Sequence, residues 1–493
     1  MTLLDSRSQE GQESPTAYST GDEGGDLIMQ GGLPDQGLSL IIGPPGSGKT
    51  VLALQIAFVA ARTGRNVVYL TSTSESHVRL LQHARQFTFF DERVIRKNFN
   101  LISINTHVQQ QGVEATINYI VDVARSAKAD LLIIDGFVGL KQLFQTQNVN
   151  LMYTLISRLN LFAFTTVLLG SYQADSNTEA EFAVADAIVE LSHDLQNLQR
   201  QRFVSVLKIR GKACLEGLHS FAINQHGITM YPRQESLATA PLAPRTTERL
   251  FWGIPELDTM LGGGVFRGST TMIKGGTGMG KTLLGLQFLL AGAPDEPGLF
   301  VSLQESTEDI ARYLHDTGGT PQQIANIRVI HMSPTEINLD VLAWRIRKHV
   351  VEAGTRRIVL DTFDAITDSF HQRHRLSGFI ASLNTSLRSY NITTIFIRET
   401  PWMLGGQTTL PNDDQQGVVD TMLFIFNVVL AATLQRVIAV VKHRGSEHQG
   451  TLRKLDVVDG QIVIGAPLRQ FAQILSGSPM QSEPSVEGEA NYE

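Results

Sequence analysis

Two segments of the chain have the residue types and spacing of a phosphate-binding loop. They span residues 43–50 and 275–282, and each reads Gly, four further residues, then Gly-Lys-Thr. In such a loop the glycines let backbone N–H groups approach a phosphate, the lysine neutralises its charge, and the threonine hydroxyl binds Mg²⁺. Because two chance matches in one chain are improbable, the sequence predicts two sites for the phosphates of ATP.

The segments around each loop support this prediction. Apolar residues at 38–42 and 270–273 predict strands before the loops, and the patterns at 51–61 and 283–290 predict helices after them. A helix that starts at the loop directs its free N–H groups at the phosphates. The residues expected to contact nucleotide are Gly43, Gly46, Ser47, Gly48, Lys49 and Thr50 in the first loop, and Gly275, Thr277, Gly278, Gly280, Lys281 and Thr282 in the second.

Each half also supplies an acidic residue suited to a magnesium site. An apolar run ends in Asp135 in the first half and in Asp361 in the second, as expected of a strand beside the loop. Such an aspartate holds the magnesium ion together with the loop hydroxyl. We therefore predict that Thr50 with Asp135, and Thr282 with Asp361, bind Mg²⁺.

Hydrolysis needs a carboxylate that orients or deprotonates the attacking water, an effect worth about 10² to 10⁴ in rate. Glu75 and Glu305 follow the next predicted strand of each half and are the candidates. Ser74 and Ser306 lie beside them at predicted helix starts, so helix capping is the alternative explanation of these segments.

A Lys-x-Arg pair ends a predicted strand near the end of each half. The pairs are Lys208 with Arg210, and Lys442 with Arg444. A cation that reaches a γ-phosphate across a subunit boundary can accelerate transfer by about 10³ to 10⁵. Taken alone, such a pair is more often a solvated strand face.

Composition places the chain among ordinary globular proteins. It has 493 residues, 42% hydrophobic and 18% charged, enough for two or three domains. With 41 basic and 48 acidic residues, the formal charge of −7 argues against nucleic-acid binding through bulk electrostatics. Cys214 is the only cysteine, which excludes an intrachain disulfide and a cysteine-based zinc cluster.

We expect a cytoplasmic protein without membrane contact. The polar segment 1–30 has no signal-peptide pattern. The apolar run 422–441 is interrupted by Asn427, Gln435 and Arg436, and two buried strands explain it better than a membrane span does.

The halves form an internal repeat. Lys281 follows Lys49 by 232 residues, and Arg444 follows Arg210 by 234. A nearly constant offset indicates a duplicated α/β domain, each copy a mainly parallel β-sheet flanked by helices around a P-loop. The expected organisation is a disordered tail at 1–20, a first domain at 21–232, a linker at 233–245, a second domain at 246–476 and a disordered acidic tail at 477–493.

These features together resemble the KaiC family of double-domain RecA-like ATPases, which includes the cyanobacterial clock protein. The resemblance covers about 21–479 and is most specific at 262–284, 442–448 and 474–479. It implies tandem RecA-like domains in a homohexameric double ring, with ATP bound between subunits. It further implies hydrolysis in the N-terminal ring, and autokinase and autophosphatase activity in the C-terminal ring.

The resemblance also assigns roles to particular residues. Ser446 and His448 would belong to the second nucleotide pocket. The two Lys-x-Arg pairs would face the nucleotide of the next subunit.

Departures from the family pattern alter these expectations. The first of two adjacent family glutamates is replaced by Ser74 in one half and Gln304 in the other, which predicts slower catalysis. The family's phosphoacceptor pair aligns with Gln416 and Gly417, so autophosphorylation is not expected there. The tail after Pro479 is short for the segment that the clock protein offers to KaiA.

The leading hypothesis is a homohexameric signalling ATPase that uses ATP and Mg²⁺, with an unidentified partner of the KaiB-like or two-component kind. An autokinase acting on Thr408, Thr409 or Thr421 is a second. A catalytically weak, ATP-bound scaffold is a third. A RecA/RadA-like DNA-dependent ATPase is a fourth, and the acidic balance counts against it.

Overall fold

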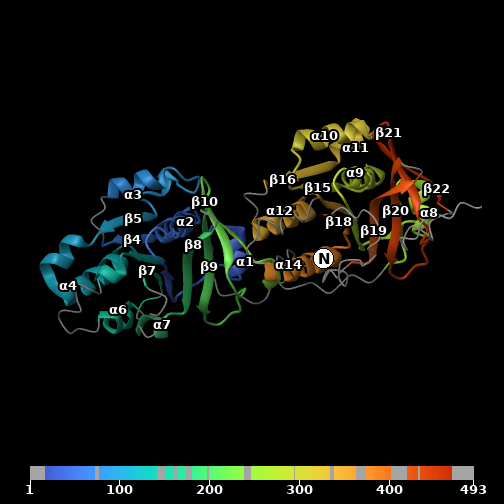
Figure 1. The fold of residues 1–493 in the computed structure, drawn as a ribbon. Coiled ribbons are helices and arrows are strands. Elements are labelled where there is room, and N and C mark those ends of the chain that lie inside the picture. The colour runs from blue at the N-terminus through green and yellow to red at the C-terminus, as the bar shows by residue number, and fades with distance from the viewer. Residues whose placement is uncertain are drawn as a thin grey trace, which may run out of the picture. The chain divides into compact units, whose positions relative to one another are not determined.

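A computed structural model of the chain contains two compact units, Met1–Leu237 and Ala238–Glu493, each considered by itself (Figure 1). The residues that the structure describes are 17–72, 77–140, 151–159, 162, 164–172, 180–196, 199–237, 246–293, 295–333, 338–361, 373–400, 419–430 and 433–468.

The first unit extends beyond its expected bounds at both ends. Tyr18 is buried and donates its hydroxyl to Asp130 O at 2.9 Å. At the other end, the short 3₁₀ helix η2 (Gln234–Ser236) buries Gln234. Residues 17–20 and 233–237 therefore belong to the first unit rather than to the tail and linker in which the sequence analysis placed them.

The first unit is built on one mixed sheet with the strand that precedes the phosphate-binding loop at its centre. Within the described residues the sheet has nine strands in the order β11-β10-β9-β8-β3-β7-β6-β4-β5. Strand β3 is parallel to both neighbours, β7 and β8, and the segment from β8 to β11 is antiparallel. The strands are β3 (Leu38–Ile42), β4 (Val67–Thr71), β5 (Phe99–Ser103), β6 (Leu131–Asp135), β7 (Thr165–Gly170), β8 (Ala187–Gln196), β9 (Gln199–Ile209), β10 (His219–Asn224) and β11 (Gly227–Tyr231), with a separate pair β1 (Ala17–Tyr18) and β2 (Leu33–Pro34).

Helices cover both faces of this sheet. Alternate strand residues point to opposite faces, and each set joins its own apolar core. Helix α2 packs in one core and helices α4 and α6 in the other. The helices are α1 (Glu23–Ile28), α2 (Lys49–Arg62), α3 (His77–Ala84), η1 (Glu92–Val94), α4 (Asn105–Ser126), α6 (Leu151–Leu159) and α7 (Ala180–Val184).

The second unit repeats the topology of the first. Its nine described strands follow the order β16-β15-β17-β18-β14-β19-β20-β21-β22, with β14 parallel to β18 and β19. Each strand thus occupies the place of its counterpart, which confirms the duplicated α/β fold. The strands are β14 (Thr270–Gly275), β15 (Gly298–Ser302), β16 (Ile327–His331), β17 (Arg357–Asp361), β18 (Thr393–Glu399), β19 (Thr421–Leu430), β20 (Thr433–His443), β21 (Arg453–Val458) and β22 (Gln461–Pro467), with the pair β12 (Arg249–Leu250) and β13 (Val265–Phe266).

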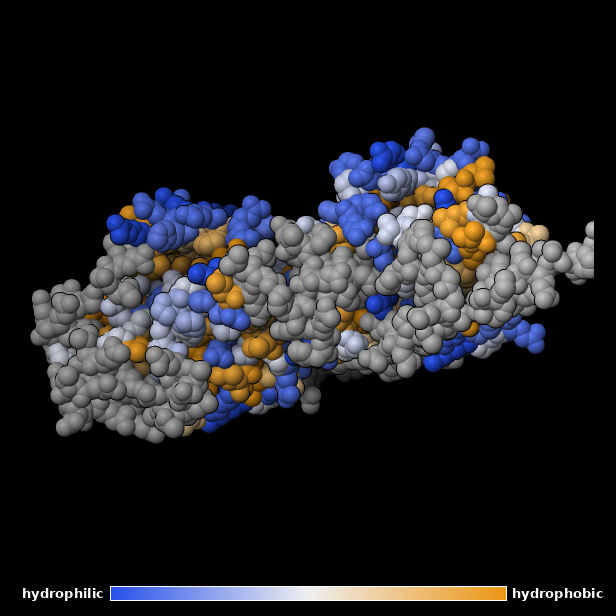
Figure 2. Space-filling view, in the orientation of Figure 1, coloured by the Kyte–Doolittle hydropathy of each residue, from blue (hydrophilic) through white to orange (hydrophobic). Residues whose placement is uncertain are grey.

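Its helices are divided between the two faces in the same way, as Figure 1 shows for α9 and α10 against α12 and α14. Helix α10 buries Ile310 and Leu314, one turn apart, and leaves its outer face hydrophilic (Figure 2). The helices are α8 (Pro255–Met260), α9 (Lys281–Gly292), α10 (Thr307–Asp316), α11 (Pro321–Ala325), α12 (Leu339–Glu352) and α14 (Arg373–Ser389).

The elements predicted around the loops are confirmed. Strand β3 matches the predicted segment 38–42, and α2 and α9 begin at the loop lysines. The apolar run 422–441 lies in β19 and β20, the two strands expected there. Among the described residues, no helix is both long and apolar enough to cross a membrane.

A buried ion pair fixes the start of β17 in the second unit. Arg357 is 4% exposed, and its Nε donates to Glu296 Oε2 at 2.6 Å. Its Nη1 donates to the backbone oxygens of Phe251 and Phe288 at 3.1 and 2.9 Å. Burial lowers the pKa of Arg357, and the Glu296 carboxylate opposes that shift.

We predict that Glu296→Ala lowers the free energy of unfolding of the second unit by about 3–5 kcal/mol, because it leaves a buried guanidinium without its carboxylate. The matched control is Glu248→Ala, which removes the exposed carboxylate that pairs with Arg267 at 2.7 Å. Urea unfolding measures both variants. Equal losses of stability in the two variants would contradict the role of burial.

Candidate functional site

The first phosphate-binding loop joins the carboxyl end of β3 to the amino end of α2. Gly48 caps α2 with φ of 105°, a left-handed conformation that favours glycine, and a Cβ there would lie 3.0 Å from Ile223. Lys49 Nζ donates to Gly43 O at 2.7 Å and to Pro44 O at 2.9 Å. Burial lowers the pKa of Lys49, while the charge of Asp135 opposes that shift.

The second loop is built in the same way between β14 and α9. Gly280 has φ of 87°, and a Cβ there would lie 3.0 Å from Ile462. Lys281 Nζ donates to Gly276 O at 2.7 Å. It also lies 3.9 Å from Glu399 Oε1, a carboxylate on the neighbouring strand β18.

Both loops fit a phosphate ligand. At Gly43 the backbone passes so close to strand β8 that a Cβ would lie 2.0 Å from Leu191 O. Ser47 is buried, and its Oγ has no hydrogen-bond partner among the described residues. Helices α2 and α9 begin at the loop lysines, and the free N–H groups of a helix N-terminus favour anions.

The predicted magnesium ligands lie together in each unit. Thr50 Oγ1 donates to Asp135 Oδ2 at 3.0 Å, and Thr282 Oγ1 donates to Asp361 Oδ2 at 2.6 Å. Tyr69 OH also donates to Asp135 Oδ2, at 2.9 Å. A hydroxyl and a carboxylate are hard oxygen ligands suited to Mg²⁺, which keeps several of its waters.

Of the two candidate water-orienting residues, Glu305 lies among the residues that the structure describes. Glu305 follows β15, and Ser302 Oγ donates to its backbone oxygen at 2.7 Å. Ser306 Oγ accepts from Asp309 N at 3.1 Å and caps α10, so the predicted cap is confirmed here without use of the Glu305 carboxylate. Glu75 lies outside the described residues.

The Lys-x-Arg pair of the first unit stands at the opposite edge of its sheet from its own loop. Lys208 is the penultimate residue of β9, and Arg210 N donates to Asp186 O at 2.7 Å. The Asp186 carboxylate in turn accepts from Leu38 N, the first residue of β3, at 2.9 Å. Lys49 follows the far end of this five-residue strand. At about 3.3 Å per residue, this strand alone places about 16 Å between the Lys208–Arg210 pair and Lys49.

The second unit has the same arrangement. Arg444 N donates to Asp420 O at 2.9 Å, and the Asp420 carboxylate accepts from Thr270 N at 3.1 Å. Lys442 Nζ donates to Val419 O at 2.8 Å, and burial, together with the charge of Arg444, lowers the pKa of Lys442. Lys442 and Arg444 therefore lie at the amino-terminal end of β14, whereas Lys281 follows its carboxyl-terminal end.

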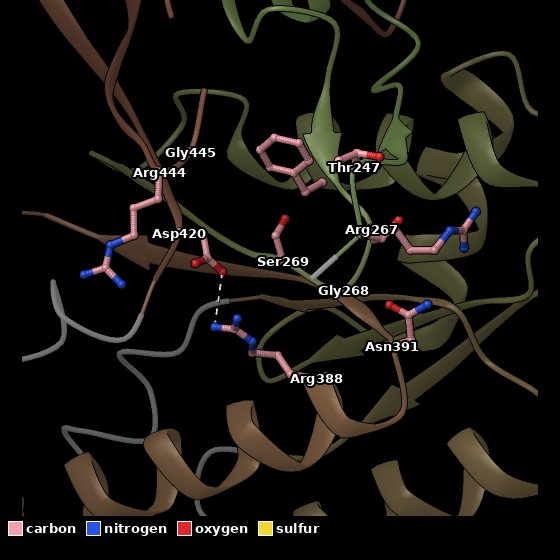
Figure 3. Close-up of a pocket in the computed structure, with 11 residues that line it drawn as sticks. Thr247, Arg267, Gly268, Ser269, Arg388, Asn391, Asp420, Arg444 and Gly445 are labelled. Atoms are coloured by element: carbon pink, nitrogen blue, oxygen red, sulfur yellow. Dashed lines mark ion pairs between the residues drawn. The ribbon is translucent and has the colours of Figure 1, made fainter. Parts of the chain in front are cut away.

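The two arginines differ in their ion pairs. Arg210 Nη1 lies 3.3 Å from Asp186 Oδ1. In the second unit Asp420 pairs with Arg388 of α14 at 3.5 Å, and Arg444 extends separately along a cavity of about 200 Å³ (Figure 3). Arg444 is exposed, and within the described part of the chain its guanidinium has no hydrogen bond or ion pair.

His443 anchors the segment that carries Arg444. Its ring stacks on Phe266 and its Nδ1 lies 2.8 Å from Thr421 Oγ1. The Arg249 guanidinium lies over the Phe266 ring and donates to Ser446 Oγ at 2.6 Å. Burial, reinforced by the Arg249 charge, lowers the pKa of His443 to about 4, so the imidazole is neutral at pH 7.

Thr421 is a correction to the sequence analysis, which named it as a candidate phosphoacceptor. Its side chain is fully buried and hydrogen-bonded to His443. A buried hydroxyl cannot reach a γ-phosphate without unfolding of the strand. The other candidates, Thr408 and Thr409, and the positions Gln416 and Gly417 lie outside the described residues. His448 is exposed.

Three further residues of the site carry no motif in the sequence: Glu399 and the two aspartates that hold the loop strands, Asp186 and Asp420. Each aspartate precedes a strand, and the residues around it form no pattern with a distinctive spacing. Glu399 ends a strand next to the loop, and a comparison of strand ends between the two halves would have revealed it, because the first half has Ser171 there.

Comparison with known proteins identifies relatives over nearly the whole chain. A "Circadian clock oscillator protein KaiC" from Picosynechococcus sp. is 26% identical over 476 residues, covering 93% of this chain and 91% of that protein. One from Synechococcus elongatus is 25% identical over 479 residues, covering 93% and 90%. A "Circadian clock protein KaiC3" from Synechocystis sp. is 27% identical over 489 residues, covering 94% and 95%.

The family described as "ATPase: KaiC" matches residues 18–235 and 251–469. Each matched range contains one phosphate-binding loop and the aspartate beside it, within the sheet order that the two units share. The match therefore covers tandem α/β domains of the RecA-like kind, each with its own loop. The chain belongs to the KaiC family of ATPases.

Proposed function

We propose that the protein is an ATP-hydrolysing regulator of the KaiC kind that assembles as a homohexameric double ring, with ATP bound between subunits. The observation that carries the proposal is the separation of each Lys-x-Arg pair from the loop of its own unit. A cation at the amino edge of the sheet cannot reach a phosphate at the carboxyl edge of the same chain. It can serve a nucleotide bound to a neighbouring copy.

In each site the chain would bind and orient the triphosphate. Lys49 or Lys281 neutralises phosphate charge, and the backbone N–H groups of the loop hold the phosphate oxygens. Thr50 with Asp135, or Thr282 with Asp361, would hold the Mg²⁺, which supplies charge neutralisation at the phosphates.

Water activation would fall to Glu75 and Glu305. A carboxylate that orients the attacking water contributes about 10² to 10⁴ in rate. Ser74 and Gln304 stand where the family resemblance expects a second glutamate, so we infer slow turnover. The exposed cations Arg210 and Arg444 would stabilise charge on a neighbour's γ-phosphate.

We do not extend the proposal to autophosphorylation at Thr421, because that hydroxyl is buried. The partner is inferred to be a signalling protein of the KaiB-like or two-component kind, from the family resemblance alone. A cytosolic site of action is part of the same inference.

We predict that Lys49→Ala and Lys281→Ala each remove the turnover of one site, and that the double variant has none, because a phosphate loses its neutralising cation. Phosphate release with and without a magnesium chelator measures this, and light scattering follows size with ATP. A wild-type chain that stays monomeric in Mg-ATP and releases no phosphate would contradict the proposal.

A second prediction tests the shared site. In a Lys281→Ala background, Arg210→Ala is expected to lower turnover by about 10³ or more while ATP still binds. The Arg210–Asp186 pair is exposed and contributes little stability, so folding should be unaffected.

Mixing supplies the decisive control. Chains with Lys49→Ala keep Arg210, and chains with Arg210→Ala keep Lys49. If rings assembled from both kinds of chain regain part of the lost turnover, each intact loop has used a neighbour's arginine. Activity equal to the average of the separate variants would show that the site is completed within one chain.

A further inference from the structure

Glu399 places a carboxylate inside the second phosphate-binding loop. It ends β18 in register with Gly275, the first residue of the loop. Its Oε1 accepts from Thr277 Oγ1 at 3.3 Å and lies 3.9 Å from Lys281 Nζ. The Glu399 side chain is 37% exposed and that of Lys281 is 8% exposed. A negative charge therefore stands at the buried cation that would otherwise neutralise a phosphate.

In the described part of the first unit, the corresponding position carries no charge. Ile42 is in register with Gly170, and the next residue, Ser171, corresponds to Glu399. Lys49 makes its contacts with two backbone oxygens, those of Gly43 and Pro44. Among the described residues, the two loops therefore differ by one ionised group beside the lysine.

This difference acts on a bound polyphosphate in two ways. The carboxylate competes with phosphate oxygens for Lys281 Nζ and Thr277 Oγ1. It also repels the anion, since like charges within a few ångströms oppose each other strongly in a partly dry site. Both effects weaken binding at the second loop and are absent at the first.

We propose that Glu399 lowers the nucleotide affinity of the second site, because its carboxylate lies beside Lys281 and Thr277 and competes with a polyphosphate for them. The first site then fills at a lower ATP concentration than the second. This inference rests on the proposed function, because it assumes that both loops bind ATP.

The test isolates each site with a loop-lysine variant and measures the binding of a magnesium-bound, non-hydrolysable ATP analogue. In the Lys49→Ala background, Glu399→Gln is expected to tighten binding by about tenfold, because it keeps the shape of the side chain and removes the charge. Glu399→Asp keeps the charge and should bind as weakly as the parent. A purely structural role would not separate these two variants.

The reciprocal change transfers the effect to the first site. In the Lys281→Ala background, Ser171→Glu is expected to weaken binding by about tenfold. Unchanged or weaker binding in Glu399→Gln would overturn the role of Glu399 while leaving the nucleotide sites intact. Absence of binding in both backgrounds and in the wild-type chain would overturn the proposed function, and this inference with it.

Discussion

The parallel register of the central strand with its two neighbours is the constraint on which the rest of the structure depends. In the first unit β3 lies between β7 and β8, and all three point the same way. Their carboxyl ends therefore meet at one edge, where the loop and Asp135 lie. The antiparallel return through β9 brings Lys208 and Arg210 back to the other edge. The loop and the Lys208–Arg210 pair thus lie at opposite ends of the strands of one sheet.

Asp186 and Asp420 maintain this arrangement. Each carboxylate accepts the first N–H group of the loop strand, and each backbone oxygen accepts from the arginine that follows the return strand. These hydrogen bonds therefore connect the arginine at one end of the sheet to the strand that leads to the loop at the other end.

Much of the fold could be predicted because its signals are local. The loops, the strands ending in Asp135 and Asp361, and the constant offset between halves each depend on short segments with strong patterns. The strand-end position of Glu399 can be read from a comparison of the two halves, but its contact with Lys281 cannot, since that contact depends on the register of two strands that lie far apart in sequence. The burial of Thr421 depends likewise on packing against His443. Tyr18 was assigned to a tail because its neighbours in the sequence are polar, although Tyr18 and Thr20 are both buried.

The central claim is that each nucleotide site is completed by a second copy of the chain. Its most direct test is an experimental structure of the full chain with Mg²⁺ and a non-hydrolysable ATP analogue. The account predicts a ring in which Arg210 and Arg444 of one subunit lie within hydrogen-bond distance of the γ-phosphates held by Lys49 and Lys281 of the next. A nucleotide bound to a single copy, with its γ-phosphate contacted by cations of that same chain alone, would contradict it.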